Sequence, residues 1–412
     1  MEHTSRADGR KRYFCGTHRI RTPAETLARV KPHLRQLGIT RVANVTGLDV
    51  IGIPVTMVTR PNGRSLSLHQ GKGPELDAAK ASGILEAAEH HVAEHLAGPD
   101  RTATLNDLER EARVVDVGRL PRSVRVRDPG ASMGWAQGQD LAAGQPVWVP
   151  YEMVHVDLRL PLPAGSGFFP LGSNGLASGN DFAEAAVHAL GELVERDALA
   201  LFYQESVEEQ LRRRLDLGTV DDDVCLDLIA RFEAAGVELA VWDMTSDLGI
   251  ASVFCMAVDR VFDPFRPVGV ARGSGAHLDR GVALSRALCE AAQSRLTRIV
   301  GARDDLQAND FERLRSREAT ERAHGQMRAE RGSRAFCAIP STSTNSVPCD
   351  LDEIRTRLAA RGMTEVVVVE LSRSADLPFA VLRAIVPGLE GVIASPSYRP
   401  GLRAARRPEG AP

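Results

Sequence analysis

Long apolar runs, paired cysteines and a strong net charge are all missing from this sequence. No run approaches the length needed to cross a bilayer, and the charged N-terminus lacks the apolar core of a signal peptide. The net charge of −3 gives no electrostatic case for binding nucleic acid or an anionic membrane. The six cysteines include no C-x-x-C pair, so neither a zinc knuckle nor a disulfide framework is indicated. We therefore expect a cytoplasmic protein with no membrane or nucleic-acid partner.

The common phosphate-binding motifs are missing as well. The sequence has no Walker A motif, and no G-x-G-x-x-G follows a predicted strand. A conventional ATP-dependent ligase is therefore disfavoured. Basic residues do gather near both ends, in 6–12 and 399–407, and we interpret both groups as solvated tails.

What remains is the composition of an ordinary folded protein, with 43% apolar and 25% charged residues in 412. Strand-like runs alternate with helical patterns, which predicts an α/β fold of mixed α+β character. Helices are expected after Thr22, from Asp181 and over 351–361, and an exposed helix with a loop over 304–335. Strands are expected within 42–60, 65–68, 237–245, 251–259, 366–371 and 379–386. Residues 98–150 have no long period and read as a lobe or insertion.

Three alanine-rich helical segments set acids or amides three residues apart. They are Ser82–Glu89, Glu184–Arg196 and Ser285–Gln293. On an α-helix this spacing places both side chains on one face, where they can grip one object. The second segment follows a Gly/Ser-rich stretch, and Gly273-Ser-Gly275 introduces the third.

The second of these helices carries the densest acidic stripe, within about 80° on a helical wheel. The stripe consists of Glu184, His188, Glu192 and Glu195. A solvated surface face is the plain interpretation. The small residues Ala185 and Gly191, and the lack of a Lys or Arg among the acids, favour a ligand site instead. Mg²⁺ binds clustered carboxylates together with substrate phosphates, so a nucleotide–magnesium site is the sharper hypothesis.

Two cations are candidate phosphate partners for this site. Arg196 directly follows the stripe and can bind phosphate oxygens as a bidentate fork. Lys72 lies in Gln70-Gly-Lys-Gly73, predicted as a turn between a strand and the first acidic helix, where backbone N–H groups are open to anions. His90 and His91 end that helix and are either ligands or ordinary exposed histidines.

Several further motifs occur together and in order. They are Gly38-Ile-Thr-Arg41, Thr46-Gly-Leu-Asp49, Ile51-Gly-Ile-Pro54, Arg60-Pro61, Gln70-Gly-Lys-Gly73, Ser173-Asn-Gly-Leu-Ala-Ser178 and Glu192-x-x-Glu195-Arg196-Asp197. As a set they resemble the YcaO family, from about Thr17 to Arg303, and Val386–Glu390 and Tyr398–Ala404 are similar too. The resemblance implies a fold of that family's own, with ATP and Mg²⁺ as cofactors. It also implies that ATP activates a peptide backbone amide by phosphorylating its oxygen, after a nucleophile has added to the amide carbon.

The resemblance also assigns roles to individual residues. The implied metal ligands are Glu86, Glu89, Glu184, Glu192, Glu195 and Gln293, with Glu290 as a further candidate. The implied phosphate and nucleotide contacts are Lys72, Ser82, Arg196 and Arg298. His90 departs from the pattern, because an arginine often follows the second glutamate there. His188 and His18 are the candidate general bases, and the sequence ranks neither.

The product depends on the nucleophile, which the sequence leaves open. Members of the family make azolines, thioamides from external sulfide (often alongside a TfuA protein) or macroamidines, each on a precursor peptide. This chain shows neither a Pro-x-Pro-x-Pro tail nor a recognisable leader-peptide-binding extension before Thr17. Both observations favour a stand-alone or TfuA-partnered member, and the resemblance also admits a homodimer.

We expect an N-terminal tail over 1–16 and a YcaO domain over 17–412. Within it, residues 17–97 carry the first acidic helix, 98–150 form the lobe or insertion, and 151–412 carry the other two acidic helices. The alternative function is a nucleotide-binding accessory protein. Such a protein would assist modification of a cellular target, such as a ribosomal protein, without catalysis of its own.

Overall fold

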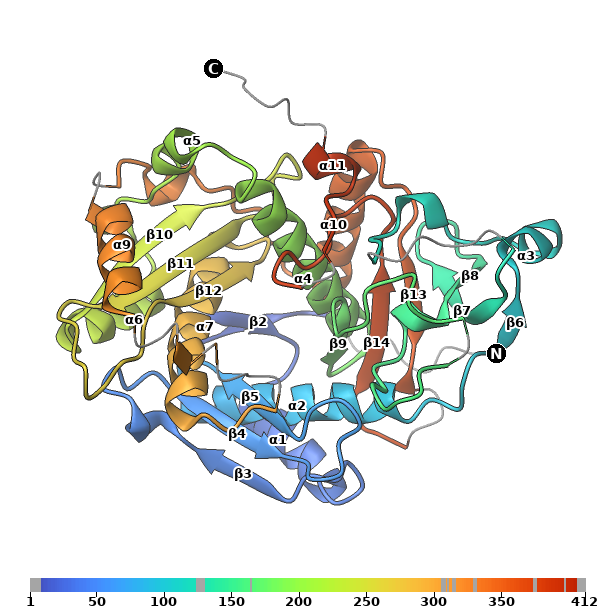
Figure 1. The fold of residues 1–412 in the computed structure, drawn as a ribbon, viewed down its shortest axis with the longest axis horizontal. Coiled ribbons are helices and arrows are strands. Elements are labelled where there is room, and N and C mark those ends of the chain that lie inside the picture. The colour runs from blue at the N-terminus through green and yellow to red at the C-terminus, as the bar shows by residue number, and fades with distance from the viewer. Residues whose placement is uncertain are drawn as a thin grey trace.

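A computed structural model of the chain shows antiparallel sheets arranged around a centre where helices α2, α4 and α7 approach one another (Figure 1). It describes residues 9–123, 130–163, 165–304, 309, 311–312, 316–328, 332–372, 376–395 and 398–405. The mixture of helices and sheets confirms the expected fold class.

The N-terminal part builds a three-stranded antiparallel sheet, in the order β3-β4-β5, covered by a long helix. Its elements are β1 (Arg12–Phe14), β2 (Thr17–Arg19), α1 (Pro23–Val30), β3 (Arg41–Asn44), β4 (Val55–Thr59), β5 (Leu68–Lys72) and α2 (Leu76–Glu94). The predicted start of α1 is confirmed. The Thr22 side chain accepts a hydrogen bond from the Glu25 N–H, and the Glu25 carboxylate accepts one from the Thr22 N–H.

The predicted turn at Gln70–Gly73 is wrong, because β5 continues through Lys72. Gly71 explains the difference, since a Cβ at this position would lie 1.9 Å from the Ala79 carbonyl oxygen of α2. The glycine therefore serves close packing of helix on strand. Successive strand residues face opposite sides, so His69 faces α2 together with Gly71, while Gln70 and Lys72 point away from it.

The middle of the chain builds a second antiparallel sheet, β10-β11-β12, covered by α7. The elements of this middle part of the chain are β9 (Leu176–Gly179), α4 (Phe182–Phe202), α5 (Val207–Arg212), α6 (Asp223–Ala234), β10 (Val237–Asp243), β11 (Ser252–Asp259), β12 (Ala271–Ala276) and α7 (Arg280–Val300). Of these, β9 joins the third sheet. Gly273-Ser-Gly275 lies inside β12, which corrects its prediction as a lead into the helix. A Cβ on Gly273 would lie 2.1 Å from the Ala287 carbonyl oxygen, so glycine again lets a helix pack closely on a strand.

The third sheet joins segments far apart in the chain, in the order β6-β7-β13-β14-β9, with β8 paired to β7. The remaining elements are β6 (Arg101–Ala103), α3 (Leu105–Glu111), β7 (Met133–Asp140), β8 (Pro146–Pro150), α9 (Arg317–Arg328), α10 (Val347–Ala360), β13 (Val367–Glu370), β14 (Ala380–Ile385) and α11 (Leu402–Ala405). The segment 98–150 thus supplies three strands to this sheet. The proposed subdomain boundaries themselves stay a prediction.

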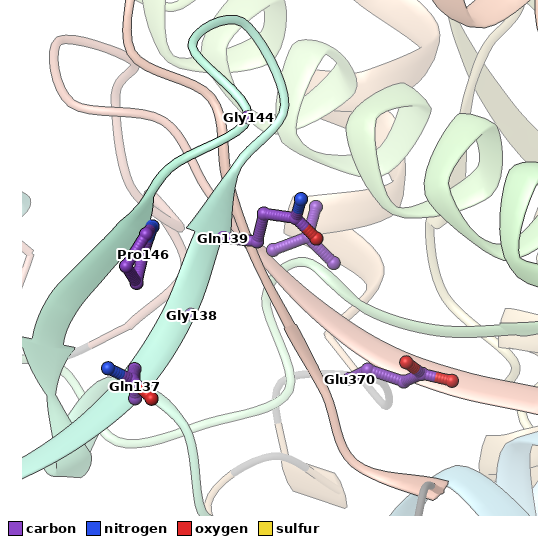
Figure 2. A pocket seen from close by; sticks show the side chains of 7 residues that line it. Gln137, Gly138, Gln139, Gly144, Pro146 and Glu370 are labelled. Atoms are coloured by element: carbon purple, nitrogen blue, oxygen red, sulfur yellow. The ribbon is translucent and has the colours of Figure 1, made fainter. Parts of the chain in front are cut away.

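A small hollow of about 200 Å³ lies where β7 and β13 diverge (Figure 2). β13 pairs with β7 only at Val367 and Val368, and the side chain of Glu370 lies beyond this short ladder. The hollow is polar, with Gln137 and Gln139 from β7, and it is separate from the large cavity described below.

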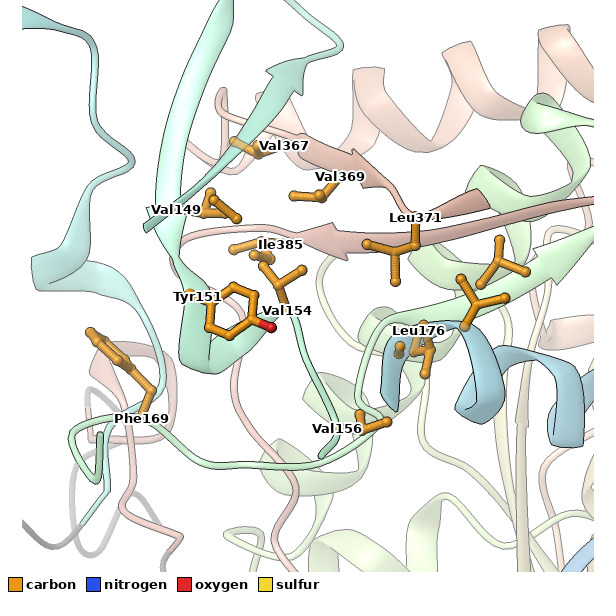
Figure 3. Close-up of a cluster of buried hydrophobic side chains, with 14 of the residues drawn as sticks. Val149, Tyr151, Val154, Val156, Phe169, Leu176, Val367, Val369, Leu371 and Ile385 are labelled. Carbon is orange, nitrogen blue, oxygen red and sulfur yellow. The ribbon is translucent and has the colours of Figure 1, made fainter. Parts of the chain in front are cut away.

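The largest hydrophobic cluster fills the space between α2 and the third sheet (Figure 3). Val149, Val367, Val369 and Ile385 reach it from the strands, and Ala87 reaches it from α2. A second cluster fixes α4 to the other face of the same sheet, because Ala185, Ala189 and Leu193 pack with Val368 and Leu382. With one side of α4 fixed in this way, its acidic stripe points toward α2 and α7.

No helix in the described part of the chain is long and apolar enough to cross a membrane. The first eight residues of the predicted N-terminal tail and the closing residues 406–412 lie outside the described part, as do some residues of the region 304–335. Within that region, α9 is helical as predicted.

Candidate functional site

A single cavity of about 570 Å³ lies between α2, α4 and α7. Its size is in the range of small-molecule and cofactor sites. Most of the predicted site residues line it, namely Lys72, Ser82, Glu86, Glu89, Glu184, His188, Glu192, Glu195, Arg196, Glu290 and Gln293. The three acidic helices therefore converge on one space, although they are separated by about 100 residues each in the sequence.

One wall of the cavity pairs acids of α4 and α7 with two cations. Ser274 Oγ of β12 lies 2.6 Å from Glu195 Oε1 and 3.2 Å from Glu290 Oε1, which bridges the two helices. Arg196 Nη1 lies 3.0 Å from Glu195 Oε1, and Lys72 forms an ion pair with Glu290. The two predicted phosphate contacts thus hold carboxylates in this structure. They remain at the cavity surface, where an anionic ligand can compete for them.

Two further carboxyls of the cavity, Glu89 of α2 and Glu192 of α4, have raised pKa values. Burial, with the charges of Glu86 and Glu192, raises the pKa of Glu89 to about 8, even though its Oε1 accepts hydrogen bonds from the Ser178 N–H and hydroxyl. Burial also raises the pKa of Glu192 to about 7, with Glu195 adding to the effect and Arg196 opposing it. A cation bound here would favour the ionised form of both carboxyls.

Glu86 lies between the cavity and a buried histidine. Burial acts to raise its pKa, but His69 and His90 outweigh burial and hold the pKa below its ordinary value. His69 Nδ1 lies 3.8 Å from Glu86 Oε1, and the Glu86 side chain is 38% exposed. The expectation of an exposed terminal histidine is wrong for His90, because α2 continues to Glu94 and only 7% of His90 is exposed.

Glu184 stands apart from the other candidate ligands. It lies about 16 Å along α4 from Glu195, at 1.5 Å per residue. Its Oε1 accepts hydrogen bonds from the backbone and side-chain N–H groups of Asn180, and its Oε2 accepts one from the Ile20 N–H at 3.0 Å. These hydrogen bonds connect the segment after β2 to the start of α4, so Glu184 has a structural role in this region.

The remaining predicted residues divide between the cavity and its surroundings. The Nε2 group of Gln293 donates to the Gln70 carbonyl oxygen at 3.0 Å, which links α7 to β5. Arg298 does not line the cavity, because its Nη1 donates to the carbonyl oxygens of Val268 and Val270 at 3.2 and 2.6 Å. His18 is also outside the lining, and its ring centroid lies 5.5 Å from that of His277.

His188 lines the cavity within reach of the acidic stripe. Burial, followed by the charges of Arg286 and Arg19, holds its pKa well below the ordinary value. Its Nδ1 lies 3.4 Å from the Ser178 carbonyl oxygen, which can only accept, so Nδ1 carries the proton and Nε2 a lone pair. His188 is therefore a neutral acceptor at pH 7, whereas His18 has no access to the cavity.

Four cavity arginines were missed by sequence reasoning: Arg19, Arg21, Arg286 and Arg303. Arg286 lies one helical turn before Glu290 on α7, and this i,i+4 spacing is a signal that could have found it. Its guanidinium lies over Gly191, since a Cβ on that glycine would be 4.0 Å from Arg286 Nη1. Arg19 and Arg21 come from the N-terminal hairpin and the residues after it, where no local pattern marks them.

The donor set fits a cation held jointly with a polyphosphate. No three His, Cys, Asp or Glu side chains of the described residues form a ready-made metal cage. Mg²⁺ usually completes its shell with water and substrate phosphates, so a preformed cage is not needed. Burial is the main cause of the raised pKa values of Glu89 and Glu192, and a bound cation would lower both.

Comparison with known proteins gives consistent relatives. The family model for YcaO cyclodehydratases, described as ATP- and Mg²⁺-binding, matches residues 70–390. A protein of Rhizobium leguminosarum bv. trifolii, described as an uncharacterized protein in the tfuA 3′ region, is 38% identical over 397 residues, covering 95% of this chain and 93% of that one. An uncharacterized protein of Methanothermobacter thermautotrophicus is 34% identical over 371 residues, covering 89% and 94%.

Two solved structures share the fold. YcaO from Methanopyrus kandleri, bound with AMPPCP and Mg²⁺, superposes with a TM-score of 0.73 at 23% identity, covering 97% of this chain and 98% of that one. A heterocyclase in complex with substrate and cofactor gives a TM-score of 0.75 at 22% identity over 90% of this chain. The chain spans 53% of the length of that heterocyclase. At these identities the likeness shows the fold alone.

Proposed function

Because the chain belongs to the YcaO family of ATP- and Mg²⁺-binding cyclodehydratases, we propose that it phosphorylates the oxygen of a backbone amide in a ribosomally made precursor peptide. It is an ATP-dependent enzyme of the cyclodehydratase type, with ATP and Mg²⁺ as its cofactors. We propose the product, the peptide substrate and the roles of single residues as follows.

The observation that carries the proposal is the charge arrangement of the cavity. Buried acids short of positive charge, Glu89 and Glu192, lie in the same space as two cations, Lys72 and Arg196. A magnesium polyphosphate complements both, since its cation meets the acids and its oxygens meet the lysine and arginine. A surface face of solvated glutamates would not be buried among three helices.

The proposed reaction keeps atoms and charge in balance. A nucleophile adds to the amide carbon and loses a proton, for which the neutral His188 offers an acceptor. The former carbonyl oxygen takes the phosphoryl group and then leaves as phosphate, so the sum is the substituted amide, ADP and phosphate. When bound, Mg–ATP supplies that phosphoryl group, while Lys72 and Arg196 stabilise negative charge on its oxygens.

A thioamide is the product that we favour among thioamide, azoline and macroamidine. The relative in the tfuA 3′ region supports this choice, because TfuA proteins often accompany sulfide-using members of the family. A TfuA-like protein is accordingly the proposed partner. Sulfide would replace the amide oxygen without any oxidation or reduction.

The test is a reconstitution of the purified chain with a candidate precursor peptide, ATP, Mg²⁺ and sulfide, with and without a TfuA-like partner. We expect phosphate release together with a peptide mass change equal to one sulfur-for-oxygen exchange. Dehydration without sulfide would instead identify an azoline or amidine product. An accessory protein would bind Mg–ATP and leave the peptide unchanged with every nucleophile, and that result would overturn the proposal.

A further inference from the structure

A buried polar network lies behind the α2 wall of the cavity, on the side away from the ligand space. Glu94, 1% exposed, accepts hydrogen bonds from Arg60 Nη2 at 2.6 Å and from the Ser65 hydroxyl at 2.5 Å. Burial would raise the pKa of Glu94, but Arg60 and Ser65 hold it below the ordinary value. Glu94 is therefore an ionised acceptor, and its donors are fixed.

Arg60 continues this network to His69. Its Nη1 lies 3.3 Å from His69 Nε2, and its Nε donates to the Leu37 carbonyl oxygen at 3.1 Å. A guanidinium can only donate, so His69 Nε2 must be the acceptor. With Nε2 as the acceptor, the ring proton is on Nδ1. That atom is buried, has no partner in the described residues and lies 3.8 Å from Glu86 Oε1.

The Ser65 hydroxyl determines the tautomer of His90 in the same way. Its only hydroxyl proton goes to Glu94, so its oxygen accepts at the contact of 2.9 Å with His90 Nδ1. His90 is therefore also in the Nδ1–H form, with the lone pair of Nε2 left for the cavity that His90 lines. One carboxylate thus fixes the tautomers of two neighbouring histidines.

We propose that His69 is a positioning residue for Glu86, and that the Glu94–Arg60 pair holds it in the tautomer whose Nδ1–H is directed at that carboxylate. The inference rests on the proposed function, in which Glu86 is a ligand of Mg²⁺. Metal-binding carboxylates are commonly oriented by a hydrogen-bond donor behind them, and loss of such a donor typically lowers metal affinity about 10–100-fold.

The geometry distinguishes this role from simple core packing. His69 is 1% exposed and lies within β5, yet its Nδ1 has no hydrogen-bond partner among the described residues. Glu86 Oε1 lies 3.8 Å from that nitrogen, and the Glu86 side chain is 38% exposed. A purely structural histidine would be expected to have both nitrogens satisfied by the core.

The first test reads the tautomer directly in the full-length protein without ligand. Histidine ¹⁵N labelling and long-range ¹H–¹⁵N correlation spectra distinguish Nδ1–H from Nε2–H rings. We expect both His69 and His90 as Nδ1–H tautomers, with signals assigned by single substitutions. An Nε2–H ring or an imidazolium at His69 would overturn the proposal without any need for a variant that folds.

The second test uses two substitutions that each keep one half of the histidine. His69→Asn places an amide N–H where Nδ1 was and keeps the donor toward Glu86. His69→Gln places its amide where Nε2 was and keeps only an acceptor for Arg60. Titrating Mg²⁺ into the AMPPCP-saturated protein by calorimetry, we expect a Kd increase of about 10–100-fold for His69→Gln and a smaller one for His69→Asn.

His95→Gln is the control, because His95 is exposed at the end of α2, does not line the cavity, and its Nδ1 bonds the His91 carbonyl oxygen. Its Mg²⁺ affinity should equal that of the wild type. Equal weakening in both His69 variants, or none in either, would contradict the positioning role. Failure of wild-type protein to bind Mg²⁺ with AMPPCP would instead contradict the proposed function, so the two failures are distinguishable.

Discussion

Helix α2 carries two buried carboxylates five residues apart, and their surroundings are opposite. Glu94 faces Arg60 and Ser65, accepts hydrogen bonds on both oxygens, and has a lowered pKa. Glu89 faces the cavity, receives hydrogen bonds from Ser178 alone among the described residues, and has a pKa raised to about 8. The same residue type on the same helix is thus supplied with a cation in one place and left without one in the other.

This difference shows where the fold expects a ligand. A buried acid with a purely structural role is usually paired with a cation, as Glu94 is with Arg60, because an unpaired buried charge costs free energy. Among the described residues neither Glu89 nor Glu192 forms an ion pair within 4 Å, and the charge of Glu192 adds to the raised pKa of Glu89. We infer that their counterion comes from outside the chain. The predictions below change one member of the comparison at a time.

The largest effect is expected from removing a cavity acid. Glu192→Ala or Glu195→Ala should lower Mg–ATP-dependent activity by more than about 100-fold, the upper range for loss of a residue that only supports a metal ligand. The reason is that each variant loses a carboxylate proposed to bind the cation. Phosphate release in single-turnover assays measures the effect. Circular dichroism should show an intact fold, and wild-type turnover in either variant would count decisively against the assigned site.

Removing Glu94 should act on stability instead. Glu94→Ala leaves Arg60, 2% exposed, without its carboxylate. Breaking a buried pair in this way typically costs about 3–5 kcal/mol of unfolding free energy. Urea unfolding of Glu94→Ala and Glu89→Gln side by side provides the measurement. If Glu89→Gln is as destabilised as Glu94→Ala, the contrast between the two acids is wrong.

An intermediate effect is expected from pH. Mg²⁺ must displace protons from Glu89 and Glu192, whose pKa values are about 8 and about 7. The affinity for Mg–nucleotide should therefore rise by at least about 10-fold from pH 6 to pH 8. In a Glu89→Gln, Glu192→Gln double variant, the Mg–nucleotide affinity measured by fluorescence should depend much less on pH across this range. A flat wild-type profile would contradict the assignment.

The same shifts predict how the free protein responds to pH. The Glu89 carboxyl has an ordinary pKa of 4.5 in the unfolded chain and about 8 in the fold, so the folded state binds more protons between these values. Its contribution to the free energy of unfolding must then fall as pH rises through this window. The stability difference between wild type and Glu89→Gln, followed by urea unfolding from pH 5 to pH 8, isolates this contribution. A difference that does not change with pH would contradict it.

The smallest effect on stability is expected at Lys72. Its ion pair with Glu290 is partly exposed, with side chains 26% and 23% accessible, so Lys72→Met should change the unfolding free energy by less than about 1 kcal/mol. Loss of a phosphate contact should still weaken AMPPCP binding by about 10-fold. Unchanged affinity would remove Lys72 from the proposed nucleotide contacts.

Sequence reasoning reached the parts of the fold that are written locally. The cap of α1 at Thr22, the start of α4 at Asp181 and the strands β10 and β11 follow from short patterns and are confirmed. The three acidic helices were also visible, because i,i+3 spacing places side chains on one face. That all three line one cavity required the resemblance and then the structure.

What the sequence could not supply depends on contacts between distant residues. Gln70–Gly73 reads as a turn by composition, yet Gly71 is a strand glycine selected by the approach of Ala79. Glu184 belongs to the acidic stripe by spacing, yet Ile20 and Asn180 occupy its oxygens. Arg298 carries a suitable charge, yet two backbone carbonyl oxygens hold it outside the cavity.

The most direct measurement is a calorimetric titration of Mg²⁺ into the AMPPCP-bound protein at pH 7, repeated in buffers with different heats of ionisation. The difference between buffers counts the protons released on binding. We predict Mg²⁺-dependent binding with release of protons from the buried acids, and less release in Glu89→Gln. Mg²⁺ binding that releases no proton, or a proton release that Glu89→Gln leaves unchanged, would contradict the claim that Glu89 and Glu192 bind the cation.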